Sequence, residues 1–155
     1  KEDMYMLKYN HIIFLIIFIF IQVHSIANEE KFLSLKKNKV NVRYGPGFDF
    51  PIKYIYKKIN LPIKQIDKKE NFRRIIDYKK NSGWIHISQL KKLNSVIAEK
   101  DKILFKKPSI FSKPTANIKK GRLLLIKKCK NEWCKVETGV FKGWVDNKNL
   151  WGYIK

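Results

Sequence analysis

The chain has few of the residues that build reactive or metal-binding sites. Of its 155 residues, only two are cysteine and three are histidine. Two thiols with no histidine nearby supply half of a zinc ligand set, and the chain has no Cys-x-x-Cys redox motif. We therefore expect neither a metal site nor a cofactor.

Helical patterning is also missing. No stretch keeps the 3.6-residue hydrophobic period of an amphipathic helix. Instead, short runs rich in branched and aromatic residues recur at spacings of about ten residues, which is typical of a small barrel or sandwich. Hydrophobic residues make up 45% of the chain and aromatic residues 14%, which is enough to bury a core. The sequence predicts an all-β fold.

Acidic residues are scarce. There are 13 Asp and Glu against 34 Lys and Arg, giving a formal net charge of +21. Such a charge indicates affinity for anionic polymers or surfaces. The alternative is compositional, because nearly all the basic residues are lysines in a chain also rich in Ile and Asn. Scattered lysines without arginine clusters argue against bidentate phosphate recognition.

The longest apolar run is too short for a membrane-spanning helix. Residues 12–21 are uninterrupted apolar side chains, whereas a span needs about 20. Lys8 precedes this run and Ser25-Ile26-Ala27 follows it, which is the order of a secretory signal. We expect residues 1–27 to be a cleaved signal peptide and the mature chain to be periplasmic or secreted. The alternative is an uncleaved anchor in the inner membrane, and only then would the chain contact a membrane.

One pattern occurs twice. Phe72-Arg73-Arg74-Ile75 followed by Gly83-Trp84-Ile85 recurs about 60 residues later as Trp133-Cys134-Lys135-Val136 followed by Gly143-Trp144-Val145. The repetition predicts one small β unit used twice after the signal peptide. The expected boundaries are residues 28–93 and 94–155.

The first unit contains an ordered loop between its strands. Residues 43–51 hold two Gly and two Pro together with three aromatic side chains, so they cannot form a regular element. Gly83 suits a turn with positive φ, and residues 88–90 suit a single helical turn. Predicted strands cover residues 32–35, 40–42, 52–59, 61–66, 72–77 and 83–87 in the first unit, and 103–105, 122–126, 133–138 and 143–145 in the second.

These motifs carry a resemblance to a known family. Asn41-Val42-Arg43-Tyr44-Gly45-Pro46 resembles the N-x-R-x-G-P opening of bacterial SH3-like domains, and Phe72–Ile75 and Gly83–His86 resemble their closing strands. Phe72 stands where that family usually has Trp, and the second unit lacks the opening motif. The resemblance implies two tandem small SH3-like β-barrels.

The exposed or buried state of the aromatic side chains decides their role. In SH3-like folds, aromatics of the long loop and of the closing strands can line a peptide groove. On this reading Tyr44, Phe48 and Trp84 are the candidate ligand-binding residues. The alternative is that they form the core, because small domains need large side chains to fill it. His86 is expected to be an exposed strand histidine, since nothing in the sequence sets it in a catalytic relay.

The two cysteines flank a four-residue connection, so they can face each other across a hairpin. Export favours a Cys129–Cys134 disulfide, and two buried thiols are the alternative. Strand alternation places Cys134 on the core side with Val136 and turns Trp133 the other way.

The functional expectation follows from export, resemblance and charge together. We expect an exported, non-enzymatic binding module for cell-wall peptide (peptidoglycan) or another anionic envelope polymer. Bacterial SH3-like modules often accompany peptidoglycan hydrolases, but two such units leave no residues here for a catalytic domain. The first alternative is an envelope interaction or structural protein with a protein partner. A nucleic-acid-binding barrel suits the lysines, but the signal segment argues against it.

Overall fold

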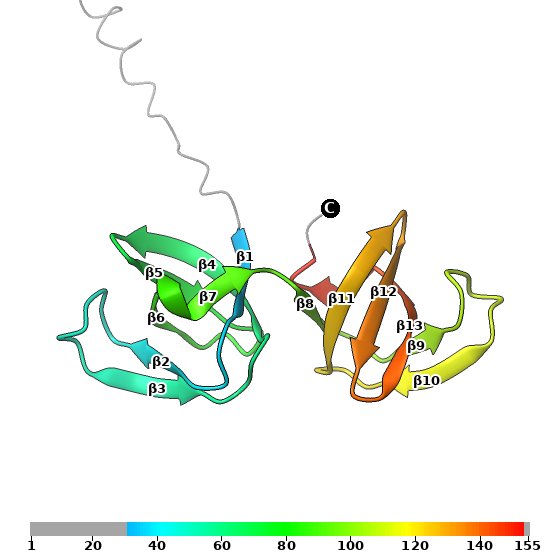
Figure 1. Ribbon diagram of the computed structural model, residues 1–155, viewed down its shortest axis with the longest axis horizontal. Helices are drawn as coiled ribbons and strands as arrows, with labels where there is room; N and C mark the ends of the chain where they lie inside the picture. The colour runs from blue at the N-terminus through cyan, green and yellow to red at the C-terminus, as the bar shows by residue number, and fades with distance from the viewer. Residues whose placement is uncertain (1–30, 154–155) are drawn as a thin grey trace, which may run out of the picture.

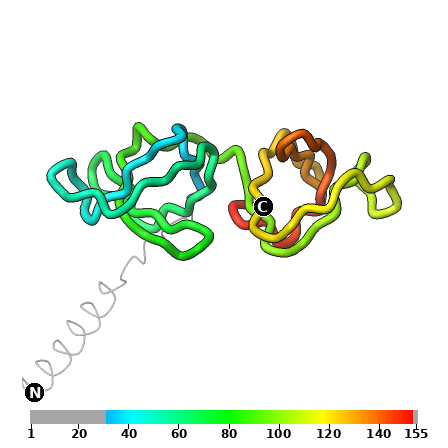
Figure 2. Tube along the Cα trace, turned by 90° about the horizontal axis from the view of Figure 1, so that it is seen from below, coloured from blue at the N-terminus to red at the C-terminus, as the bar shows by residue number. Residues whose placement is uncertain are grey.

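The computed structural model describes residues 31–153, so the predicted signal peptide lies outside the described residues. Two seven-stranded antiparallel sheets follow one another along the chain, and each curls around its own core (Figures 1 and 2). The expected all-β fold with two small tandem units is confirmed. The first sheet contains β1 (Lys31–Leu35), β2 (Val40–Arg43), β3 (Ile52–Tyr56), β4 (Pro62–Lys69), β5 (Phe72–Ile76), β6 (Ser82–His86) and β7 (Leu90–Lys92).

The second sheet contains β8 (Ser95–Ala98), β9 (Lys102–Phe105), β10 (Pro114–Ile118), β11 (Leu123–Lys130), β12 (Trp133–Thr138), β13 (Phe141–Asp146) and β14 (Leu150–Trp151). Its strand order, β10-β9-β13-β12-β11-β8-β14, repeats that of the first sheet, β3-β2-β6-β5-β4-β1-β7. One topology is therefore used twice, as the repeated sequence pattern predicts. We call residues 31–92 the first domain and residues 95–153 the second.

Aliphatic side chains fill both cores. In β2 and β6 buried and half-buried residues alternate, as expected for strands with one face toward the core. The first core contains Leu35, Val40, Val42, Ile63, Ile75, Ile85 and Leu90, and the second contains Val96, Ala98, Leu104, Ile118, Leu124, Cys134, Val136, Val145 and Leu150. Trp84 and Trp144 are half-buried and lie outside these clusters. These two tryptophans therefore contribute to the surfaces of their domains and not to the cores.

Gly83 and Gly143 lie inside strands and not in turns. The expected positive φ at Gly83 is wrong, because Gly121, Gly139 and Gly152 are the glycines with positive φ in the described chain. A Cβ at Gly83 would meet Val42 Cγ1 at 2.4 Å, and one at Gly143 would meet Phe105 O at 2.6 Å. Each glycine allows β2 or β9 to approach the last long strand of its domain.

Several strand boundaries differ from expectation by a few residues, and one strand was not expected. The predicted strand 52–59 ends at Tyr56, because the chain turns through Asn60, which has φ of 61°. Asparagine tolerates this left-handed conformation better than most residues. β10 (Pro114–Ile118) had no sequence signal, since its residues alternate only weakly in polarity.

The two domains meet through buried hydrogen bonds. Ser34 Oγ of β1 lies 3.1 Å from Ser95 Oγ of β8, which in turn donates to the carbonyl of Asn60. Asn94 N–H donates to Ser34 Oγ at 3.2 Å, and Asn94 Nδ2 donates to Asn60 Oδ1 at 3.2 Å. Buried hydroxyls need such partners. The link between β7 and β8 is therefore an ordered junction.

Aromatic contacts reinforce this junction. The Trp151 ring packs edge-on against Phe32 of the first domain, with 4.9 Å between ring centroids, and lies 6.0 Å from Tyr78. Figure 1 shows the β2–β3 loop and the β9–β10 loop at opposite ends of the long axis, with the junction between them.

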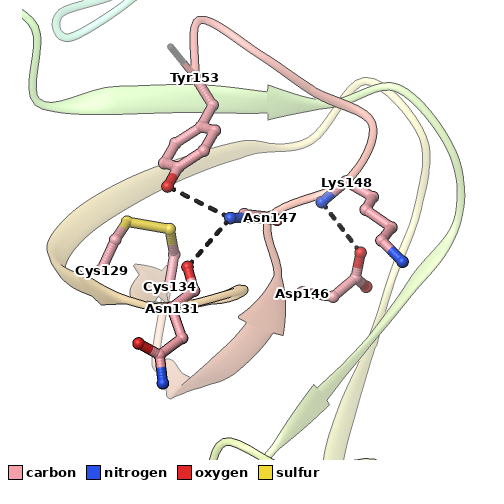
Figure 3. The surroundings of a disulfide bond; sticks show 7 residues. All are labelled: Cys129, Asn131, Cys134, Asp146, Asn147, Lys148 and Tyr153. Atoms are coloured by element: carbon pink, nitrogen blue, oxygen red, sulfur yellow. Dashed lines mark hydrogen bonds between the residues drawn. A yellow bond between two sulfur atoms is a disulfide. The ribbon is translucent and has the colours of Figure 1, made fainter. Parts of the chain in front are cut away.

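The predicted Cys129–Cys134 disulfide is confirmed (Figure 3). The two cysteines are opposite each other in the β11–β12 hairpin. Cys134 is buried with Val136, and Trp133 faces outward, where its ring meets Phe105 at 5.8 Å. Buried Asn147 holds the hairpin turn, because its Nδ2 donates to Asn131 O at 3.2 Å.

Candidate binding pocket of the first domain

The outer face of β2, β6 and β5 carries the candidate site. Val42, Ile85 and Ile75 point into the core, so strand alternation turns their neighbours outward. Register then places Phe72 opposite His86, and Arg74 and Arg43 on either side of Trp84. Side chains from three strands thus share one surface beneath the β2–β3 loop.

Arg43 fixes the loop over this surface. Its Nη1 donates to the carbonyl of Phe48 at 3.1 Å and to that of Phe50 at 2.6 Å. The guanidinium carbon lies 5.5 Å from the centre of the Phe48 ring, a cation–π distance. An arginine suits this position because its planar guanidinium can donate hydrogen bonds while it stacks on an aromatic ring. The loop is therefore folded back and held.

Phe48 completes an aromatic cluster. Its ring centroid lies 5.2 Å from that of Phe72 and 5.1 Å from that of His86, and Phe72 and His86 are 5.2 Å apart. Packing by its neighbours leaves Phe72 only 6% exposed, whereas Phe48 remains 67% exposed. One face of Phe48 is therefore fixed and the rest is available to a ligand.

A pocket of about 200 Å³ opens beside this cluster. We call it the loop pocket. Its lining residues are Lys39, Asn41, Arg43, Phe48, Phe72, His86, Ser88 and Gln89. The volume suits a small group and not a whole drug-sized ligand. Its lining combines the apolar rings of Phe48 and Phe72 with polar and cationic side chains.

The hydrogen bonds of His86 set which ring nitrogen donates. Ser88 N–H donates to His86 Nδ1 at 3.3 Å, and Ser88 Oγ lies 2.8 Å from the same atom. Because Nδ1 accepts from the backbone, the neutral ring carries its proton on Nε2. These bonds also cap the short 3₁₀ turn η1 (Ile87–Gln89). The imidazole therefore presents a donor.

The loop pocket has a one-sided charge. Lys39 and Arg43 are cationic, and none of its lining residues is acidic. Lys39 makes no ion pair among the described residues. Asn41 and Gln89 add amide groups that both donate and accept. The arrangement fits an anionic group, such as a carboxylate, joined to a small apolar group that lies against Phe48.

The structure places the three candidate residues differently. Phe48 lines the loop pocket. Trp84 is half-buried on the same face, beyond Arg43, but does not line it. Tyr44 is 62% exposed and lies 5.6 Å from the ammonium of Lys53, outside the pocket. The structure brings Phe48 together with Phe72 and His86, which sequence reasoning had not grouped with it.

In residues 31–153 no carboxylate hydrogen-bonds to His86, whose side-chain partner is Ser88. Asp77 lies at the opposite end of the β5–β6 hairpin and accepts bonds from Lys79 N–H, Asn81 N–H and Tyr56 Oη. It organises the turn there. Burial, and after it the neighbouring Tyr54 hydroxyl and Asp77 carboxylate, raises the pKa of Tyr56 well above its ordinary value. No group of three or more potential metal ligands, and no helix long and apolar enough to span a membrane, occurs in residues 31–153.

The equivalent place in the second domain is occupied differently. Trp144 pairs with Phe105 where Trp84 pairs with Arg43, and Trp133 pairs with Asp146 where Phe72 pairs with His86. Both Asp146 oxygens accept from Lys102 Nζ at 2.9 Å. Phe105 stands where the first domain has Arg43, so this domain lacks the arginine that holds the loop. The Phe105 ring instead packs edge-on against Trp133.

No curated protein matches the chain. Among solved structures it is similar to NlpC2 of Trichomonas vaginalis (11% identity, TM-score 0.36, 78% of this chain and 47% of that one). It is also similar to NlpC1 of the same organism (11% identity, TM-score 0.37, 81% and 47%). The chain spans about half the length of these two proteins, and the likeness is too distant to indicate function.

The family profile is more informative. The bacterial SH3 domain profile matches residues 36–92 and again residues 98–152. Each match corresponds to one of the two sheets described above. Bacterial SH3 domains are binding modules, often in cell-wall-associated proteins. With most of its length covered by the two matches, the chain belongs to the bacterial SH3 domain family and carries two copies in tandem.

Proposed function

We propose that this protein is an exported, non-enzymatic binding module, and that its loop pocket holds short cell-wall peptide through a carboxylate. The observation that carries the proposal is the loop pocket itself. Phe48 offers an apolar surface, Lys39 and Arg43 supply positive charge, and no acidic side chain lines the site. Peptides of the cell wall combine free carboxylates with small side chains, which matches this surface.

Export is the second part of the proposal. It is supported by the apolar run at residues 12–21, followed by Ser25-Ile26-Ala27, and by the disulfide, which persists in oxidising compartments. Expression in bacteria with the leader is expected to give a protein outside the cytoplasm that begins at Asn28. Amino-terminal sequencing that finds residues before the apolar run would show an anchored protein instead.

A pull-down against purified peptidoglycan tests the ligand class. The native protein should be retained at moderate salt, and Phe48→Ala should lose about tenfold in affinity, as expected for removal of a side chain worth about 1.4 kcal/mol or more. Tyr44→Ala is the matched control, because Tyr44 is an equally exposed aromatic of the same loop outside the pocket. Retention of Phe48→Ala equal to native would exclude the loop pocket as the site.

A series of salt concentrations separates specific binding in the loop pocket from attraction by charge alone. Lys39→Gln should weaken peptidoglycan binding. Binding of the native protein to heparin measures its attraction to any polyanion. If binding to peptidoglycan and binding to heparin decrease in parallel as the salt concentration rises, the attraction is non-specific and due to charge. An envelope protein partner is the alternative occupant of the same pocket, and it would leave peptidoglycan unbound by the native chain.

A further inference from the structure

The β9–β10 loop of the second domain exposes two large apolar side chains at its tip. Ile110 is 67% exposed and Phe111 is 92% exposed. The loop projects from one end of the long axis, away from the first domain (Figure 1). Large apolar side chains that stand together at such a site usually mark an interaction surface.

Hydrogen bonds within the loop keep it ordered. Lys106 N–H donates to Lys113 O at 2.9 Å, and Lys107 N–H donates to Ser112 Oγ at 2.9 Å. Closer to the tip, Phe111 N–H donates to Ser109 Oγ at 3.2 Å, and Ser112 N–H donates to Ser109 O at 3.1 Å. The loop satisfies these polar groups internally, as entry into an apolar medium requires.

Lysines flank the apolar tip in the sequence. Residues 106–113 contain Lys106, Lys107 and Lys113 and no acidic residue. An apolar tip between cations is the arrangement by which a peripheral protein anchors to anionic lipid: the side chains enter the acyl boundary while the ammonium groups stay among the headgroups. We call residues 106–113 the lysine-flanked tip.

We propose that the lysine-flanked tip docks the second domain on the surface of an anionic lipid bilayer, with Phe111 and Ile110 inserted at the interface. The inference is independent of the loop pocket. The tip is convex, so it would insert into its partner and not enclose one. Heparin-like polyanions would use the lysines but have no place for Phe111. The apolar and cationic groups together therefore favour a bilayer.

Vesicle co-sedimentation tests the proposal. The native protein should bind vesicles of phosphatidylglycerol mixed with phosphatidylcholine and bind pure phosphatidylcholine much less. The double substitution Ile110→Ser with Phe111→Ser leaves the charge unchanged and should reduce binding by about tenfold or more. Val140→Ser is the matched control, because Val140 is 87% exposed in the β12–β13 turn of the same domain.

Three further variants separate insertion from adsorption. Lys106→Gln and Lys107→Gln should each reduce binding to the anionic vesicles by about fivefold. In Phe111→Trp, brominated lipids should quench more tryptophan fluorescence than in the native protein. The proposal is overturned if the serine variant binds anionic vesicles as tightly as native, or if brominated lipids quench Phe111→Trp no more than native. Equal loss in Val140→Ser would likewise contradict it.

Discussion

The two domains share a strand order but use the same loop in opposite ways. In the first domain the β2–β3 loop folds back, and Phe48 packs on Phe72 and His86. In the second domain the β9–β10 loop points outward and leaves Phe111 exposed. The difference depends on the last residue of one strand, which is Arg43 in β2 and Phe105 in β9.

Arg43 and Phe105 explain the two outcomes. Arg43 donates hydrogen bonds to two loop carbonyls, and these bonds stabilise the closed loop. Phe105 has no donor and packs on Trp133, so it takes the place that Phe48 takes over Phe72. A duplicated fold thus gains a pocket in one copy and a projecting tip in the other through a few side chains outside the core.

The largest expected effect is the loss of stability when the strand glycine that both domains share is replaced. Gly143→Ala should destabilise the protein by about 2–3 kcal/mol, since the new Cβ overpacks the strand interface. It would lie 2.6 Å from Phe105 O and 2.7 Å from Leu104 Cγ. Gly83→Ala should cost less, because its nearest obstacle is the Val42 side chain and Arg43 O is 3.0 Å away. Denaturant unfolding measures both, and equal stability of variant and native would contradict the prediction.

The second largest effect is expected from removing the disulfide, which should destabilise the second domain and not the first. Its short loop predicts a loss of about 2 kcal/mol on removal by the chain-entropy estimate. The Cys129→Ser, Cys134→Ser double variant should unfold its second domain earlier, while the first domain, where Lys68 pairs with Arg73 at the equivalent place, is unchanged. Hydrogen exchange resolved by domain is the measurement. Uniform loss of protection in both domains would show that they unfold as one unit.

Arg43→Ala should release the loop of the first domain. Hydrogen bonds from a charged donor contribute about 1.5–3 kcal/mol when buried, and this partly exposed group should contribute less, about 1 kcal/mol. We expect faster proteolysis within residues 44–51 and weaker ligand binding. Arg43→Lys should restore the closed loop only in part, because an ammonium lacks the planar guanidinium that lies 5.5 Å from the Phe48 ring centre. Phe105→Ala should leave the lysine-flanked tip ordered, since that loop is held by its own hydrogen bonds.

The smallest effect is a dependence on pH that belongs to the second domain. The hydrogen bond from Lys127 lowers the pKa of Glu137, with help from Lys142, and Lys119 lowers that of Asp101. A folded pKa below the unfolded one stabilises the fold above the unfolded pKa, about 4, and that stability disappears as pH falls through the folded value. Glu137→Gln with Asp101→Asn should therefore be less stable than native at neutral pH and equal to it in acid. A difference unchanged by pH would refute the assignment.

Much of the fold could be predicted from the sequence because its signals are local. The Gly-Trp pairs, the turn residues and the alternating strands define two units without tertiary information, and the facing cysteines follow from hairpin geometry. β10 was missed because Pro114–Ile118 has weak alternation and gains its place by pairing with β9.

The site was less predictable because it depends on register between distant strands. Phe48 could be named from its loop, but its neighbours are brought to it by the pairing of Phe72 with His86 and by the bonds of Arg43. Sequence adjacency placed Tyr44 with Phe48, whereas the folded loop turns their side chains to different sides. Phe111 gave no signal, since an isolated aromatic in a polar loop has the same pattern whether buried or exposed.

The buried junction has a mechanical consequence. Ser34 and Asn60 of the first domain hydrogen-bond to Ser95 of the second, and the Trp151 ring packs edge-on against Phe32. A hinge at this place would have to break those bonds, so the domains should tumble together as one rod. If the lysine-flanked tip docks the second domain on a bilayer as proposed, the loop pocket would stand at a set distance from that bilayer. The junction would then determine how far from the bilayer the pocket can bind a ligand.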